Sequence, residues 1–150
     1  MKIALTGSSG FIGSSIARNA VEQGHEIVAL VRDTSRRDHI EPFVSEFVIG
    51  EQNELETLQS FISEADVVIH NSFDWKSLKN KNLLLHLRSN LEGSIQLLKL
   101  SEQRQFIYMS SIAVHHHMHD KWNGLIDESH PTRPGSFYGA RKASIDAHLW

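Results

Sequence analysis

The stretch TGSSGFIG at residues 6–13 limits this chain to few folds. It follows the short apolar run KIALT at residues 2–6 and opens a helix-like pattern that Gly24 ends. A strand, a glycine-rich turn and a helix in this order begin many nucleotide-binding α/β units, because the helix N-terminus offers N–H groups and a positive dipole end to an anion. The stretch therefore predicts a phosphate-binding loop at the start of a parallel α/β fold.

The three glycines of the loop have different expected roles. Gly7 lets the chain turn sharply off the strand, Gly10 lets backbone N–H groups approach a pyrophosphate, and Gly13 lets the helix pack closely on the strand. The spacing differs from G-x-G-x-x-G, and no Lys-Ser/Thr pair follows as in a nucleotide triphosphate loop. A purely structural turn is the alternative, but the strand–turn–helix context favours pyrophosphate binding.

The rest of the sequence alternates between strand-like and helix-like segments. The run EIVALV at residues 26–31 is apolar and β-branched, as is typical of a strand buried on both faces of a parallel sheet. We expect strands at 2–6, 26–31, 46–50, 65–72 and 105–111, and helices at 11–23, 55–62, roughly 80–101 and from about 137 onward. The alternation predicts an α/β protein with a doubly wound, Rossmann-like parallel sheet of about five strands, in one domain over residues 1–150 without a second domain.

The composition excludes several classes of protein. With 150 residues the chain suits one domain with a hydrophobic core, and its net charge of -3 gives no basic field for nucleic acid or a membrane surface. The sequence has no cysteine, which excludes disulfides and thiolate metal sites and fits a reducing compartment. No apolar run approaches the ~20 residues of a membrane span, and the N-terminal apolar run is too short for a signal peptide. We therefore expect a cytoplasmic protein.

The end of the second predicted strand bears on the choice of cofactor. An acidic residue there accepts a ribose 2′-hydroxyl, whereas an arginine favours a 2′-phosphate. Arg32 follows the strand, Arg36 and Arg37 come soon after, and Asp33 is the only acid nearby. A solvated arginine is the alternative, but the guanidinium fork suits phosphate geometry, so we expect NADP, with NAD as the second possibility.

Tyr138 and Lys142 form a candidate catalytic pair. The reference pKa of a tyrosine phenol, ~10, is too high for a base at neutral pH. A lysine four residues on lies on the same helix face, and its ammonium favours the phenolate. Ser111, at the end of the fifth predicted strand, can hydrogen-bond a substrate oxygen. A lone Y-x-x-x-K also arises by chance in amphipathic helices with a surface Tyr and Lys. The catalytic interpretation is favoured because the MSS at 109–111 ends the fifth predicted strand, at the carboxyl edge where α/β sheets bind ligands.

The motifs in this order resemble the extended short-chain dehydrogenase/reductase family, in its epimerase/dehydratase branch. The family pattern T-G-x-x-G-x-x-G matches residues 6–13, the serine-ended strand matches MSSIAV at 109–114, Y-x-x-x-K matches 138–142, and N-[VL]-x-G-[ST] matches NLEGS at 90–94. The resemblance spans the whole chain. It implies an NAD(P)-dependent oxidoreductase of the epimerase/dehydratase type, acting on a sugar nucleotide or a small carbonyl substrate.

The resemblance also implies roles for individual residues. Tyr138 would act as acid and base, Lys142 as its electrostatic partner and ribose ligand, and Ser111 as the anchor of the substrate oxygen. Members of the family run to about twice this length, so the chain resembles an N-terminal part that lacks most of the substrate site. The expected cofactor contacts come from Gly7, Ser9, Gly10, Phe11, Ile12, Gly13, Arg32, Glu51, Asn71, Ser72, Asn90, Tyr138 and Lys142.

The sequence departs from the family pattern at several cofactor positions. Glu51 stands where the family often has aspartate after the third strand, and HNSF at 70–73 replaces H-x-A-A. His115 stands where a tyrosine usually follows the catalytic serine. The non-enzymatic alternative is a dinucleotide-binding sensor or interaction protein of the same fold, although the presence of all three catalytic side chains favours the enzyme.

Two further features leave alternatives open. Leu84, Leu87, Leu91, Ile95 and Leu98 form an apolar stripe at helical spacing, which indicates either burial in the core or a homodimer through helices 83–100 and 137–150. The histidine-rich run at 115–119 has no carboxylates or thiols at ligand spacing, so we expect a solvated loop and no metal.

Overall fold

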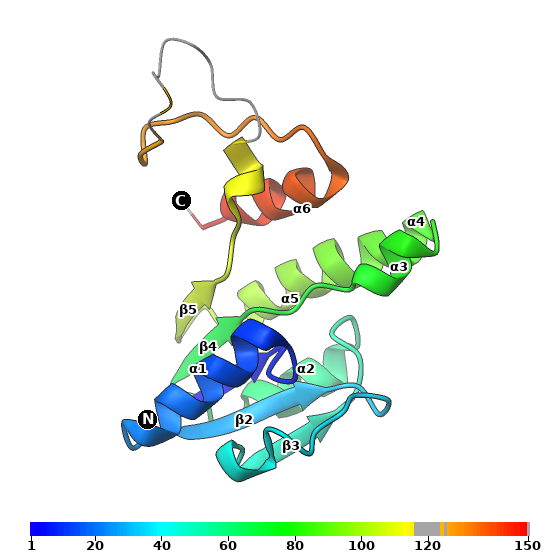
Figure 1. Ribbon diagram of the computed structural model, residues 1–150. Coiled ribbons are helices and arrows are strands. Elements are labelled where there is room, and N and C mark those ends of the chain that lie inside the picture. Colours follow the sequence, from blue (N-terminus) through cyan, green and yellow to red (C-terminus); the bar gives the residue numbers. More distant parts are fainter. Residues whose placement is uncertain (116–123, 125, 150) are drawn as a thin grey trace. The chain divides into compact units, whose positions relative to one another are not determined.

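The computed structural model describes residues 1–115, 124 and 126–149 (Figure 1). The chain divides into two compact units, Met1–Met109 and Ser110–Trp150. The larger unit contains the glycine-rich loop, and the smaller unit contains the candidate catalytic residues. No helix in the described part of the chain is long and apolar enough to cross a membrane.

The larger unit is built on a five-stranded parallel sheet in the order β3-β2-β1-β4-β5. This arrangement confirms the predicted α/β class and the Rossmann-like sheet. In the register of the sheet, Leu5 lies between Ala29 and Ile69. The strands are β1 (Lys2–Thr6), β2 (Glu26–Val31), β3 (Glu46–Ile49), β4 (Val67–His70) and β5 (Gln105–Tyr108).

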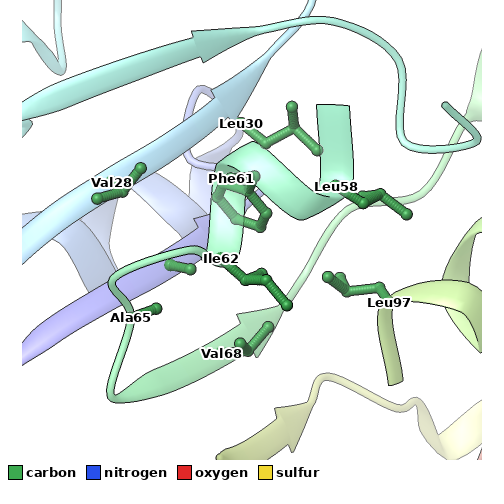
Figure 2. Packing of buried hydrophobic residues seen from close by; sticks show 9 residues of the cluster. Val28, Leu30, Leu58, Phe61, Ile62, Ala65, Val68 and Leu97 are labelled. Carbon is green, nitrogen blue, oxygen red and sulfur yellow. The ribbon is translucent and has the colours of Figure 1, made fainter. Parts of the chain in front are cut away.

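Helices cover both faces of the sheet, which is why the strands are apolar on both sides. Helix α1 (Phe11–Glu22) packs on one face, and α2 (Leu55–Ile62) and α5 (Gly93–Leu100) pack on the other. Figure 2 shows the second face, where side chains from β2, β4, α2 and α5 meet. The residues labelled there are Val28, Leu30, Leu58, Phe61, Ile62, Ala65, Val68 and Leu97.

The strands β3, β4 and β5 are shorter than the sequence predicts. The fourth covers 67–70 instead of 65–72, and the fifth covers 105–108 instead of 105–111. Beyond β4 the backbone N–H groups of Asn71 and Ser72 donate to the hydroxyl oxygen of Thr6 instead of to a neighbouring strand. The residues that follow β4 and β5 include the polar pairs Asn71-Ser72 and Ser110-Ser111, so the predicted strands extend past the point where the ladder ends.

The single helix predicted over roughly 80–101 is wrong at its N-terminal end. A separate short helix, α3 (Trp75–Lys79), comes first, and Lys81 then adopts a left-handed conformation with φ of 54°. Asn82 caps the next helix, α4 (Leu83–Leu87), by accepting a hydrogen bond from the N–H of Leu85 at 3.1 Å. A non-glycine residue in this conformation interrupts a helix, and the polar cap restarts it.

The following turns run continuously but change their winding. The π-helix η2 (Arg88–Glu92) links α4 to α5. A π-turn rotates the residues after it relative to a regular helix, so a stripe drawn at a constant helical period does not stay on one face. Leu84 is 71% exposed, whereas Leu97, outside the predicted stripe, is fully buried. Leu84 therefore does not fit the alternative in which the stripe is buried in the core.

The smaller unit pairs a short 3-10 helix, η3 (Ile112–His115), with helix α6 (Phe137–Asp146). Ser136 caps α6, because its hydroxyl oxygen accepts a hydrogen bond from the N–H of Gly139 at 3.1 Å. A Cβ added at Gly139 would lie 2.3 Å from the carbonyl oxygen of Ala113. The glycine therefore lets α6 approach η3 closely, and α6 begins where the sequence predicts.

Candidate functional site

The glycine-rich loop is held in a tight conformation that side chains would disrupt. Gly7 has φ of +69°, and a Cβ there would lie 2.9 Å from the backbone of Ser72. A Cβ at Gly13 would lie 2.1 Å from the carbonyl oxygen of Gly7. The N–H of Gly10 donates to that same carbonyl at 3.1 Å. The loop thus needs glycine at its two ends for the reasons that the sequence suggests, a sharp turn and close helix packing.

The outer side of the loop carries apolar and backbone groups. Phe11 and Ile12, in the first turn of α1, are 92% and 51% exposed. Ser9 is half-buried, and its carbonyl oxygen lies 3.1 Å from Nε2 of His39. The first turn of α1 contains no acidic residue. An anion approaching this helix N-terminus therefore meets the positive end of the dipole without a fixed negative charge from that turn.

A buried hydrogen-bond chain fixes the segment beside the loop. The hydroxyl oxygen of Thr6 accepts from the N–H groups of Asn71 and Ser72 at 3.0 and 3.1 Å, and lies 2.8 Å from Nδ1 of His70. Because this oxygen already accepts two hydrogen bonds, its own O–H donates to Nδ1. Nε2 of His70 then donates to the hydroxyl of Ser94 at 2.7 Å. His70 is thereby assigned a positioning role that the sequence did not reveal.

Asn71 and Ser72 lie next to the loop, and their cofactor roles stay predictions. Nδ2 of Asn71 is 3.4 Å from the carbonyl oxygen of Gly7, and the hydroxyl of Ser72 donates to Oε1 of Gln52. Nε2 of Gln52 donates in turn to the carbonyl oxygen of Ser89 at 2.7 Å. Gln52, which the sequence did not single out, thus connects the end of β3 with the segment after β4 and with η2.

Asn90 is buried and uses both ends of its amide within the protein. Its Oδ1 accepts from the N–H of Asp74 at 2.6 Å, and its Nδ2 donates to the carbonyl oxygen of Asp74 at 3.2 Å. Nδ2 also lies 3.0 Å from Nδ1 of His86. These contacts fix the backbone of the segment after β4. A cofactor contact by Asn90 stays a prediction.

Arg32, Glu51 and Asp74 gather where the strands β2, β3 and β4 end. Nη1 of Arg32 lies 3.5 Å from Oδ1 of Asp74. Partial desolvation raises the pKa of Glu51, while the charge of Arg32 opposes this rise and the charge of Asp74 adds to it. Arg36 pairs with the exposed Asp38 at 3.1 Å. The carboxyl ends of parallel strands are where α/β sheets bind ligands, so this charged cluster occupies a binding edge.

The candidate catalytic residues lie in the smaller unit. The hydroxyl oxygen of Ser111 accepts from the N–H of Ala113 at 3.2 Å, just before η3. Its neighbour Ser110 donates to Oδ2 of Asp146 on α6 at 2.6 Å. These two contacts, with the close approach at Gly139, tie the segment that carries Ser111 to the helix that carries Tyr138 and Lys142.

Lys142 combines a buried side chain with a lowered pKa. Its side chain is buried, with 3% of the residue exposed, while Tyr138 is half-buried. Burial lowers the pKa of Lys142 to about 8, and the charge of Asp146 one turn later opposes this shift. Tyr138 and Lys142 both lie on α6, and their roles in proton transfer stay predictions.

The histidine run is only partly covered by the structure. Residues 116–119 of the run lie outside the described residues. His115 Nδ1 is 3.2 Å from the carbonyl oxygen of Pro131, and its ring lies edge-on to that of His130. Among the described residues, no group of three or more candidate ligands can hold a metal ion. The expected absence of a metal stays a prediction.

The sheet order and the glycine loop define a Rossmann-like α/β fold. The chain belongs to the NAD dependent epimerase/dehydratase family, whose model matches residues 3–150. This match confirms the resemblance drawn from the motifs.

Individual relatives match most of this chain but less than half of their own length. A putative dihydroflavonol 4-reductase of Synechocystis is 29% identical over 144 residues, which cover 93% of this chain and 40% of the relative. A 4-hydroxy-2-methyl-3-oxo-4-farnesyl-3,4-dihydroquinoline-1-oxide ketoreductase of Stigmatella aurantiaca is 26% identical over 149 residues. These cover 97% of this chain and 44% of the relative.

A solved structure gives the same picture. The UDP-glucose 4-epimerase of Thermus thermophilus, in complex with NAD, superimposes with a TM-score of 0.85 at 25% identity. The superposition covers 99% of this chain and 50% of that enzyme. The chain thus corresponds in length to about half of a family member.

Proposed function

We propose that this chain provides the cofactor-binding and proton-transfer part of an NAD(P)-dependent oxidoreductase of the epimerase/dehydratase type. The substrate class is a sugar nucleotide or a small carbonyl compound. The observation that carries the proposal is the buried Lys142, whose pKa is lowered to about 8, four residues after Tyr138 on α6. Perturbed lysines of this kind cluster at functional sites, because burying a charge costs stability.

The loop between β1 and α1 fits a dinucleotide. At Gly7 and Gly13 a Cβ would collide with backbone, so the loop is compact and leaves the first turn of α1 open to a pyrophosphate. When bound, the nicotinamide supplies hydride transfer. The protein then has to bind the phosphates, orient the substrate oxygen and move one proton.

The proton chemistry falls to the three predicted side chains. The Tyr138 hydroxyl exchanges a proton with the substrate oxygen, the Ser111 hydroxyl orients that oxygen, and the Lys142 ammonium stabilises the phenolate. Below pH 8 the ammonium form of Lys142 predominates. Ser111 has a fixed backbone contact through the N–H of Ala113, which supports its role as an orienting group.

The cofactor itself is expected to be NADP. We predict that the chain binds NADP(H) at least ~10-fold more tightly than NAD(H), because a charged contact to phosphate contributes about 1.5–3 kcal/mol. Arg32→Ala should weaken the binding of NADP but not of NAD, and so reduce the difference between the two affinities. Calorimetric titration of both proteins with both cofactors measures this. Equal affinities in the parent chain, or a preference for NAD, contradict the prediction.

We also propose that the chain self-associates through helix 83–100, with 137–150 as the second helix of the interface. The supporting observation is a run of exposed leucines, Leu83 at 50%, Leu84 at 71% and Leu85 at 44%. Exposed apolar patches of this kind are typical of protein interfaces.

A charge in this patch should prevent association. We predict that Leu84→Glu shifts the protein to monomer over a concentration range in which the parent forms dimers, as measured by sedimentation equilibrium. Leu55→Glu is the matched control, because Leu55 is also half-exposed, at 49%, but begins α2. A parent chain that is monomeric throughout, or a control that dissociates equally, refutes this interface.

A further inference from the structure

We propose that Asp74 determines how strongly the site distinguishes NADP from NAD, because its carboxylate holds Arg32 and the 2′-phosphate has to displace it. The inference rests on the proposed cofactor function and adds a specificity-determining residue to it. Asp74 lies 42 positions after Arg32 in the sequence, on the segment that follows β4.

The carboxylate of Asp74 is positioned independently of Arg32. Its Oδ1 accepts hydrogen bonds from the N–H groups of Lys76 at 3.1 Å and Ser77 at 3.4 Å, which caps α3. The backbone N–H and carbonyl of Asp74 are both bound by the buried amide of Asn90. The side chain of Asp74 is only 13% exposed. A fixed anion therefore stands at the carboxyl edge of β4 whether or not a cofactor binds.

Arg32 is held much more loosely. Its side chain is 48% exposed, and its Nη1 lies 3.5 Å from Oδ1 of Asp74, an ion pair longer than a good hydrogen bond. Because the arginine is half-exposed and the contact is long, this ion pair contributes little free energy, so the guanidinium can exchange partners. A phosphate placed within reach of Arg32 would compete with Asp74 for the same group.

The charges around the pair are nearly balanced. Arg32 and Lys76 are the cations that act on Glu51, and Asp74 and Glu54 are the anions that act on it. With Glu51 itself the cluster holds three carboxylates and two cations, so it offers no surplus positive field to a phosphate. A 2′-phosphate gains Arg32 only by releasing it from Asp74, and it then lies near an uncompensated carboxylate. A 2′-hydroxyl needs no such exchange.

The test removes the charge of Asp74 and keeps its shape. In Asp74→Asn the side-chain oxygen can still cap α3, since asparagine is among the best N-cap residues, and the backbone contacts to Asn90 are unaffected. We expect the affinity for NADP to rise about fivefold, the upper range for an exposed ion pair, while NAD affinity changes less than about twofold. Titration calorimetry with both cofactors measures the two values.

A double-mutant cycle separates this mechanism from a general charge effect. In the Arg32→Ala background, Asp74→Asn should raise NADP affinity clearly less than it does in the parent, because there is no arginine to release and only the repulsion between carboxylate and phosphate is removed. Asp38→Asn is the matched control, since Asp38 is an exposed acid that pairs with Arg36 instead. It should not alter the ratio of the two affinities.

The outcomes distinguish the inference from the proposed function. An unchanged ratio in Asp74→Asn, or the same gain for NADP with and without Arg32, overturns the role of Asp74 while cofactor binding stands. Failure of the parent chain to bind either cofactor overturns the proposed function, and this inference with it. Melting curves of each variant establish that the compared proteins are folded.

Discussion

Replacing Tyr138 with phenylalanine should reduce turnover by about 10²–10⁴-fold, the usual contribution of a positioned acid or base. The measurement requires a protein of the relatives' full length that carries this chain, with a substrate that the parent accepts. Affinity for the cofactor should change less than about twofold, because in the proposed function the loop at Gly7 and Gly13 binds the phosphates. A loss in turnover with unchanged cofactor binding identifies the phenol as a group that takes part in the reaction.

The neighbouring residues provide the controls. Phe137→Leu changes an exposed aromatic one position away and should leave turnover unaffected. Ser111→Ala should be milder than the tyrosine variant, with a rate loss on the order of 10²–10³ if the serine acts as an oriented hydrogen-bond donor. Near-normal turnover in Tyr138→Phe would remove the catalytic assignment and favour a dinucleotide-binding sensor of the same fold.

The sheet was predictable because its pattern is local. Strands such as EIVALV are apolar on both faces, and in the structure β2 has its residues buried alternately against α1 and against α2. The glycine spacing was predictable for the same reason, since the collision at Gly13 involves a residue only six positions earlier. Short-range sterics and burial leave a clear pattern in the sequence.

The helix predicted over 80–101 is wrong at its start because the apolar pattern gives no sign of the break between α3 and α4, which lies at polar residues. Lys81 enters the left-handed region, and two polar caps, Asp74 and Asn82, begin short helices on either side of it. Aspartate and asparagine before helical patterns are recognisable start signals, so the break was accessible to sequence reasoning. The π-turn η2 has no such signal, and it moves Leu97 into the core in place of the predicted stripe.

Long-range polar contacts account for what the sequence did not reveal in the site. Thr6 and His70 are 64 positions apart, and Gln52 and Ser89 are 37 apart. Hydrogen bonds of this kind carry no periodicity, and they depend on which strand ends meet at one edge of the sheet. The same edge joins Arg32 to Asp74, which is why an arginine after β2 was found but its carboxylate partner was not.

The second large expected effect concerns stability. We predict that Lys142→Met raises the free energy of unfolding at neutral pH by roughly 3 kcal/mol, because 1.36 kcal/mol accompanies each unit by which burial lowers the pKa. The folded pKa of about 8 lies below the ordinary value of 10.5. Burial therefore disfavours the charged form of Lys142 in the folded state. The resulting loss in the free energy of unfolding is fully present below pH 8. It diminishes as the pH rises from 8 to 10.5, where the unfolded chain also loses the proton.

Chemical denaturation at a series of pH values tests this sign. The difference between Lys142→Met and the parent should be largest at pH 7 and should shrink toward pH 10.5, whereas Lys99→Met, which removes an exposed lysine of α5, should show no such trend. The stabilised variant should also lose cofactor affinity and turnover, because in the proposed function the same ammonium serves the ribose and the phenolate. A pH-independent difference, or none, would mean that Lys142 carries no burial cost. Stability gained together with function lost is the signature of a charge kept buried for chemistry.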